Sequence, residues 1–529
     1  MTTTAYARQL DNVVAIRKRL FQNSLLLGVS RLLSTCTALI SVPIIVVKLG
    51  LTGYGGWEAI MAIAAICTGF QQVISGALVW KMSEAYGNDN RAGIERLARI
   101  GIGVALALFL LSCPTVWALR YQMVALSNIP APYRAVARWV LPWLVSQMVL
   151  GSVGETFGAV LISHQRAGVM TLIQSGAVVA NNAFVIFGLT RGWQLWSLLA
   201  GNTVGVASTI IGLYIAVTRI SGGAIRVIPL LPKWTEAKPL LRYAGFLAIG
   251  CVSVILRDQT DKLVLANVGS TLWTAWFGMA SRLANLILIV CGFFYVPLVS
   301  AVAALNARGD WAGVRKLYDN VMVALPLLMG AIVVLIASAY DRLLVMWIGR
   351  PVPQVGPLLF ILLAGNITAV VLTGAGTSLC KGVGRVEIET TYVVVCVVLN
   401  ITLKFILTWI LGPIGSVLAS ASSWALSSVV FIILLHRILS LPRVTLRAAV
   451  SVPVMAAAVA IARLAAGAPP ATSTRWHAAL SVSEIGLFAI AVYIVLLIAT
   501  GALPLPVFRR MGSICRAAIM PRRGVRYEF

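Results

Sequence analysis

The sequence has few charged residues, and acidic residues are the scarcer kind. Only 11% of the 529 residues are charged, with 16 acidic residues against 42 basic ones. Hydrophobic residues make up 60% of the chain, and the mean hydropathy is +0.93. A soluble domain cannot bury that much apolar surface, whereas a bundle of membrane helices displays it to lipid. The composition therefore predicts an all-α polytopic membrane protein.

Histidine and paired cysteine are scarce as well. The three histidines are scattered, and none of the eight cysteines forms a C-x-x-C pair with another. Metal sites and disulfide frameworks normally need such clusters, so the sequence indicates neither of them. We expect no cofactor, while a coupling ion, H⁺ or Na⁺, stays open.

Long apolar runs, by contrast, are abundant. A helix needs about 20 apolar residues to cross a bilayer. The sequence predicts fourteen spans, at about 21–48, 56–80, 99–118, 137–163, 169–190, 195–218, 243–267, 273–303, 319–340, 354–380, 388–411, 414–436, 447–466 and 480–503. The first run is too long for the apolar core of a signal peptide and ends in no cleavage motif, so we expect it to be retained.

Basic residues orient these spans. Most of them fall before the first span, in every second loop and in the C-terminal tail. The positive-inside rule therefore predicts that both termini are cytoplasmic. The net charge of +26 then reflects topology and contact with anionic membrane lipids, and we expect no nucleic-acid partner. The arginine-rich tail could alternatively dock a partner such as a polysaccharide-assembly enzyme.

The predicted loops are all short. A membrane glycosyltransferase or polysaccharide polymerase usually carries a sizeable extramembrane loop or domain for its active site. No predicted loop offers one, and no cluster of His, Asp and Glu replaces it. The sequence therefore favours a protein that is not an enzyme.

An internal repeat divides the chain. "LGLTGYGGW" recurs as "VGSTLWTAW" 219 positions later, so that Gly50 and Trp57 correspond to Gly269 and Trp276. The same offset recurs across six spans, and because six is even the two copies share one orientation. Such parallel repeats predict two six-helix lobes around a central cavity. The predicted domains are 1–242 for the first lobe, 243–441 for the second, and 442–529 for two extra C-terminal helices and the basic tail.

Two arginines lie near mid-membrane with no acidic residue one helical turn away. Arg31 in the first span and Arg282 in the eighth each lie roughly 15 Å deep, at a rise of about 1.5 Å per residue. Ionisable groups at such depth cost roughly 2.5–3.5 kcal/mol each, so by default they face protein or a water-filled cavity. Both arginines are predicted to bind an anionic substrate. Hydrogen bonds to carbonyls of another span are the alternative.

A denser group of charges interrupts the seventh span. It consists of Arg257, Asp258, Asp261 and Lys262. Residues four apart can pair on one helix, which allows Arg257 with Asp261 and Asp258 with Lys262. The group could be a self-neutralised structural cluster. In the functional alternative, the two basic residues bind substrate, and Asp261 or Asp258 binds a coupling ion or exchanges partners when the lobes move.

Three further polar side chains are candidates. Gln71 and Gln72 in the second span could bind sugar hydroxyls, although glutamines also pin helices together. Glu155 in the fourth span could pair with a basic cavity residue and act as an ion-coupling or switch residue.

Three stretches resemble the multidrug/oligosaccharidyl-lipid/polysaccharide (MOP) exporter superfamily. They are the first span through Pro43 into "KLGLTGYGGW", then "DKLVLANVGSTLWTAWFGMASRL", and "GVGRVEIETTYVVVCVVLNITLKFILTWILGPIGSVLAS". The match covers roughly residues 20–440 and is nearest to the polysaccharide-transporter branch, which includes O-antigen flippases.

The resemblance implies export of a lipid-linked saccharide from the inner to the outer leaflet of a bacterial inner membrane by alternating access. Related lipid II flippases place cavity arginines on their first and eighth helices, where Arg31 and Arg282 fall. They also place one on the second helix, where this chain offers only Gln71, Gln72 and Lys81. By analogy, the last two spans could form a groove for the lipid tail.

The expected function is therefore a flippase for an undecaprenyl-pyrophosphate-linked oligosaccharide. Unpaired arginines would hold its phosphates by charge-assisted hydrogen bonds. A multidrug exporter of the same superfamily is the first alternative, although cationic drugs would favour unpaired carboxylates in the cavity. A membrane-embedded polysaccharide enzyme and a scaffold without transport activity are the others.

Overall fold

The protein consists of helices joined by short turns throughout the part of the chain described by the structure, a computed structural model. The described residues are 3–221, 228–439, 445–467 and 474–501. The basic tail predicted to dock lipid or a partner lies outside them.

The first half of the chain forms six helices. They are α1 Thr3–Thr68, α2 Phe70–Gly87, α3 Arg91–Ala125, α4 Ala131–Ser163, α5 Ala167–Thr190 and α6 Leu195–Ser221. α1 turns at Gly50, whose φ of 71° and ψ of 172° are not helical. Glycine adopts this conformation readily because it has no Cβ. α1 thus contains the predicted first span and the start of the second, which continues as α2.

The second half is more broken. It contains α7 Trp234–Val264, the π-turn η1 Leu265–Gly269, α8 Thr271–Ala307, α9 Trp311–Ser338, α10 Tyr340–Ile348, α11 Val355–Thr373, α12 Gly376–Val383, α13 Val386–Leu411, α14 Pro413–Leu439, α15 Thr445–Ala466 and α16 Arg475–Ala499. The predicted tenth span is divided into α11 and α12 at Gly374, where φ is 37°. The short helix α10 was not predicted from the sequence.

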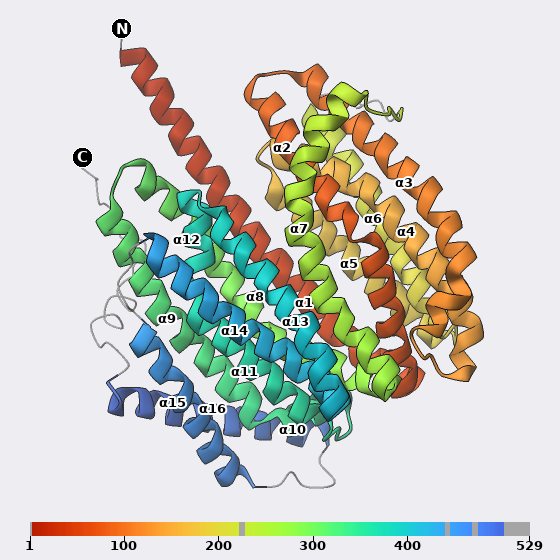
Figure 1. Ribbon diagram of the computed structural model, residues 1–529, viewed down its shortest axis with the longest axis vertical. Helices are drawn as coiled ribbons and strands as arrows, with labels where there is room; N and C mark the ends of the chain where they lie inside the picture. Colours follow the sequence, from red (N-terminus) through yellow and green to blue (C-terminus); the bar gives the residue numbers. More distant parts are fainter. Residues whose placement is uncertain (1–2, 222–227, 440–444, 468–473, 502–529) are drawn as a thin grey trace.

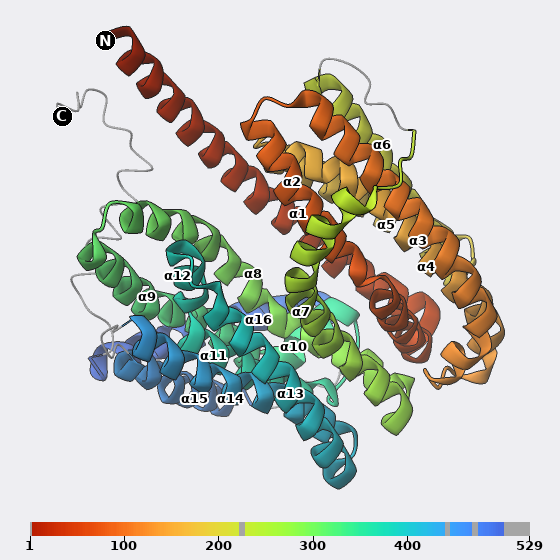
Figure 2. The ribbon, with the colours of Figure 1, turned by 45° about the horizontal axis from the view of Figure 1, so that its top comes forward.

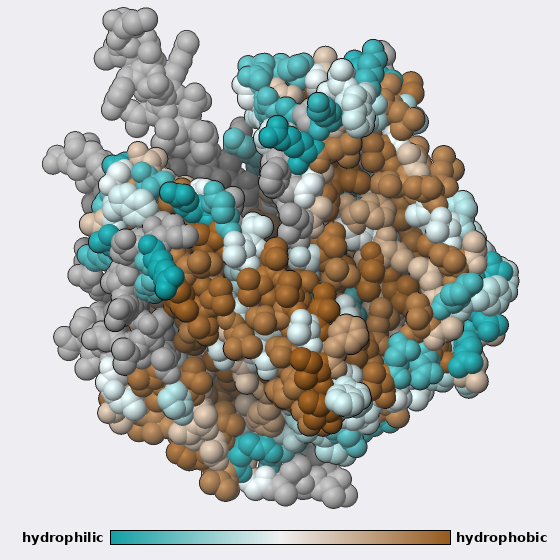
Figure 3. Space-filling view, viewed as in Figure 1, coloured by the Kyte–Doolittle hydropathy of each residue, from teal (hydrophilic) through white to brown (hydrophobic). Residues whose placement is uncertain are grey.

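The membrane class is confirmed. Among the described residues, eleven helices are long and apolar enough to cross a bilayer. Apolar residues cover the middle of the face shown in Figure 3, with hydrophilic residues gathered toward its ends. One of the eleven stretches, Leu26–Thr68, extends over two predicted spans. The number of fourteen stays a prediction.

Helices from the two halves of the sequence gather on opposite sides of the molecule (Figures 1 and 2). α2–α6 lie on one side and α8–α14 on the other, while α1 and α7 run between them. α1 packs against α5 and α8, and α7 packs against α2 and α13. α15 and α16 pack against α9. This arrangement brings α1, α7 and α8 together at the centre of the molecule.

Two helices in corresponding places of the repeat begin alike. The Asn90 side chain accepts a hydrogen bond from the Gly93 amide at 2.8 Å before α3, and Asp310 does the same for Gly313 before α9. Such caps satisfy amide groups that a helix start leaves free. The repeat is thus visible in local structure, while the lobe boundaries 1–242, 243–441 and 442–529 stay predictions.

Candidate functional site

Two neighbouring cavities lie among the central helices. The first, of about 340 Å³, is bounded by α1, α7, α8, α11 and α14, and its charged lining residues are Glu58, Arg257, Asp258, Asp261, Lys262 and Arg282. The second, of about 520 Å³, lies between α1, α5 and α8. Asn285 and Leu288 of α8 line both, so one helix forms a wall shared by the two cavities.

Glu58 links the two predicted lobes through one carboxylate. Its Oε2 accepts a hydrogen bond from Lys262 Nζ at 2.8 Å, and its Oε1 accepts one from Arg282 Nη2 at 2.8 Å. The Glu58 side chain is only 6% exposed. Charge-assisted hydrogen bonds of this length are among the stronger ones in proteins. Since Glu58 comes from α1 and its partners from α7 and α8, these bonds hold the two halves of the chain together.

These ion pairs lie toward the end of the molecule opposite the N-terminus. Glu58 follows the turn at Gly50, while Lys262 precedes and Arg282 follows the turn at Leu265–Gly269. The second cavity lies nearer the N-terminal end of α1, because Ser30 and other residues of that part line it.

Arg257 pairs with its immediate neighbour. Its Nε donates to Asp258 Oδ1 at 2.8 Å, and its guanidinium lies 4.6 Å from the centroid of the Trp424 ring. A guanidinium over the face of an indole is attracted to the ring's negative quadrupole. Asp258 remains half exposed. The pair presents a cation, a carboxylate and an aromatic ring to the first cavity.

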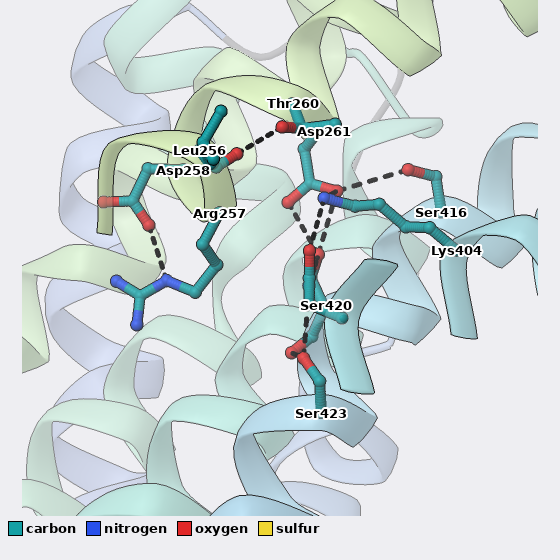
Figure 4. A network of polar contacts seen from close by, with 10 residues as sticks. Leu256, Arg257, Asp258, Thr260, Asp261, Lys404, Ser416, Ser420 and Ser423 are labelled. Atoms are coloured by element: carbon teal, nitrogen blue, oxygen red, sulfur yellow. Dashed lines mark hydrogen bonds and ion pairs between the residues drawn. The ribbon is translucent and has the colours of Figure 1, made fainter. Parts of the chain in front are cut away.

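Asp261 is held by helices of its own half of the chain (Figure 4). Its Oδ1 lies 3.1 Å from Lys404 Nζ of α13, and Ser416 and Ser420 of α14 donate to its carboxylate. Lys404 also donates to Asn400 Oδ1 at 2.8 Å. Both charged side chains of the pair are nearly inaccessible to solvent.

No family model and no curated protein sequence matches this chain. Solved structures do. The lipid II flippase MurJ in an inward closed conformation has a TM-score of 0.67 and 13% identity, over 91% of this chain and 98% of MurJ. A multidrug resistance MATE family transporter of the MOP superfamily, in an inward-facing conformation, has a TM-score of 0.64 and 13% identity, over 78% and 98% of the two chains. The MATE transporter VcmN of Vibrio cholerae in its bent form has a TM-score of 0.55 and 15% identity, over 81% and 98%. The chain has the fold of a MOP-superfamily transporter.

Within this MOP fold, the pairing predicted along the seventh span is wrong. Arg257 does not bind Asp261, and Asp258 does not bind Lys262. Asp261 pairs instead with Lys404, and Lys262 with Glu58. The partners come from other helices that pack near α7. Around the Asp261–Lys404 pair, these helices also supply hydroxyl and amide groups that hydrogen-bond to the charged side chains.

Arg282 is likewise not the unpaired cation that the sequence suggested, because Glu58 lies within hydrogen-bonding distance. The side chains of Arg31 and Gln72 lie outside the described residues. The neighbours of Arg31 in α1, Ser30 and Ser34, line the second cavity.

The remaining candidates make helix contacts. Gln71 Nε2 donates to the Met148 carbonyl at 2.8 Å, as the helix-pinning alternative predicted. Glu155 Oε1 accepts a hydrogen bond from Gln174 Nε2 at 3.2 Å, an amide rather than the basic cavity residue expected. Gln71 and Glu155 lie together on a small separate cavity in the MOP fold.

Glu58 and Lys404 are the residues that sequence reasoning undervalued. Each is an ionisable side chain within an apolar run, and this placement alone signals a buried partner. The partners themselves could not be identified, because Lys262 and Arg282 lie 204 and 224 residues from Glu58 along the chain.

Proposed function

We propose that the protein exports a lipid-linked anionic saccharide, of the undecaprenyl-pyrophosphate type, across a bacterial inner membrane by alternating access. The main support is the charge of the first cavity. Asp261 is neutralised by Lys404, which lies outside the cavity lining. The charged lining residues that remain are three cations and two carboxylates, namely Arg257, Lys262 and Arg282 with Glu58 and Asp258. A cavity whose lining carries excess positive charge suits phosphate groups.

A bound phosphate group would compete with Glu58 for Arg282 and Lys262. This competition would open the end of the molecule opposite the N-terminus. Phosphate oxygens offer these cations the same kind of bond that Glu58 now provides, and a guanidinium can bind two phosphate oxygens at once. When the cations turn to the phosphate, Glu58 no longer ties the two lobes together. The bound headgroup itself thus releases the contact that blocks its exit.

In such an exporter, the fourteen spans predicted from the sequence would form two parallel six-helix lobes with two appended helices, and both termini would be cytoplasmic. The second cavity then faces the cytoplasmic half, where Arg31 of α1 would meet the entering headgroup. Arg257 would hold the saccharide-phosphate on the α7 side. Ion coupling through Asp261, Asp258 or Glu155, and contact with polysaccharide-assembly enzymes, stay predictions.

The solved structures with a similar fold include both a flippase and a multidrug transporter. MurJ is named a lipid II flippase, and one of the MATE proteins is named a multidrug resistance transporter. Both names describe transporters rather than enzymes. The cavity charge favours the flippase, since cationic drugs would have to bind beside three basic side chains.

The test is export of lipid-linked saccharide in cells or proteoliposomes. Replacing Arg282 or Arg31 by alanine should reduce export at least tenfold with normal membrane levels, because each removes a phosphate ligand. Arg308→Ala, on the exposed end of α8, is the matched control and should export normally. Full export by both cavity variants would contradict the anion site. Efflux of cationic dyes without saccharide export would favour a multidrug transporter.

A further inference from the structure

Lys404 and Asp261 lie in a cluster of polar side chains contributed by α7, α13 and α14 (Figure 4). Lys404 Nζ lies 3.1 Å from Asp261 Oδ1 and 2.8 Å from Asn400 Oδ1. Ser420 Oγ lies 2.7 Å from Asp261 Oδ2, and Asn400 Nδ2 donates to Ser420 and Ser423 at 3.0 and 3.1 Å. Carboxylate, amide and hydroxyl oxygens of this kind are the ligands that hard cations take in proteins.

This cluster forms part of the wall of the first cavity. Asp261 and Ser420 line the first cavity, while Asn400, Lys404 and Ser423 stand behind them with at most 5% of their surface exposed. A small cation from the cavity could reach the Asp261 carboxylate. There the ammonium group of Lys404 already occupies the position beside the Asp261 and Asn400 oxygens.

The other half of the chain shows that the fold itself does not need this ion pair. At the repeat offset, Asp261 and Lys404 correspond to Val42 and Val185, which are both buried in one apolar cluster. Ser420 corresponds to Gly201, where an added Cβ would clash with the Val185 side chain. The first half therefore packs a valine against a glycine where the second half places a lysine beside a serine.

We propose that Lys404 is a tethered cation, whose ammonium occupies an oxygen-lined site that would otherwise hold a soluble monovalent cation such as Na⁺. The lysine cannot leave, so Asp261 stays neutralised throughout the transport cycle. On this inference Asp261 is a structural partner of Lys404, which leaves only Asp258 and Glu155 of the three predicted residues as candidates for ion coupling. The inference concerns cation binding and holds whichever substrate is exported.

Cation binding to the purified full-length protein tests the proposal. The thermal unfolding midpoint is measured in NaCl and in choline chloride at equal ionic strength, and ²²Na⁺ binding is measured at equilibrium. The natural protein should show no Na⁺-specific rise in midpoint and no saturable binding through this site. Lys404→Ala should gain both, because Asp261 and Asn400 then face an empty position. The double variant D261V/K404V, copied from the first half of the chain, should fold and bind no Na⁺.

Each outcome decides for or against the tethered cation. Saturable Na⁺ binding by the natural protein that is lost in Asp261→Asn would overturn it, as would a folded Lys404→Ala variant without Na⁺ binding. If the Lys404→Ala variant accumulates poorly, we expect NaCl to restore the amount of folded protein and choline chloride to leave it unchanged. Failure of that recovery, with the double-valine variant well folded, would also overturn the proposal.

Discussion

Glu58 is a single buried carboxylate that balances two cations from the other half of the chain. Removing one partner of a fully buried pair costs about 3–5 kcal/mol, since the other charge stays buried. The Lys262 and Arg282 side chains are 19% and 35% exposed, so water can compensate for part of the loss. We expect a cost of about 1–3 kcal/mol for losing the carboxylate.

Glu58→Gln should therefore lower the Tm of the purified protein, because glutamine keeps the shape but leaves two cations uncompensated. Adding Lys262→Met to this variant should restore part of the Tm by removing one of them. Glu84→Gln, which removes an exposed pair with Lys81, is the control and should leave the Tm unchanged. Equal Tm values for both glutamine variants would show that Glu58 does not hold the two halves of the chain together.

At the scale of helices, the backbones of α1 and α8 lie close together just beyond their turns. A Cβ added at Gly55 of α1 would clash with the Thr271 carbonyl at the start of α8. Glycine is required there by close approach of two backbones rather than by its own dihedral angles. Gly55 lies one helical turn before Glu58, so this contact and the Glu58 ion pairs join the same helices.

Gly55→Ala should push these helices apart and open the end opposite the N-terminus. A cysteine introduced at Ser281, on the first cavity, should then react faster with a membrane-impermeant maleimide added outside the cell, in a background lacking the native cysteines. Gly56→Ala is the matched control, since its Cβ would meet only Ile129, at 3.9 Å. Equal labelling of the two variants would refute the predicted separation.

Helices were also where sequence reasoning succeeded best. Apolar runs predicted the membrane class, and the repeat paired Gly50 with Gly269, both of which lie at turns in the structure. Pairing between helices was not predictable, because a charged side chain on α7 has neighbours on several helices at similar distance. Asp261, for example, binds Ser420, which is 159 residues away in the sequence. Spacing along one helix therefore suggested the wrong partners.

At the scale of the whole molecule, the two halves of the chain also meet outside the charged cluster. Asn267 beside α7 donates a hydrogen bond to the Leu126 carbonyl at the end of α3. This contact lies toward the same end as Glu58. Alternating access would require it to break in each cycle.

Cysteines at positions 126 and 267, joined by a short, reducible thiol cross-linker, should therefore stop export, and reduction should restore it. Each single-cysteine variant should be insensitive to the reagent. A pair within one half, Gln147→Cys with Thr203→Cys, replaces a hydrogen bond between α4 and α6 and should tolerate cross-linking. Normal export by the cross-linked 126–267 protein would exclude opening at this end.

The permanent pairing of Lys404 with Asp261 has an electrical consequence. Moving one elementary charge across a membrane potential is worth about 2.3 kcal/mol per 100 mV. If no soluble cation travels with the cargo, the protein returns to the same charge after every cycle, and the net charge moved is that of the headgroup. In a cell whose interior is negative, outward flipping of an anionic headgroup would run downhill in voltage, so each export event would itself carry current.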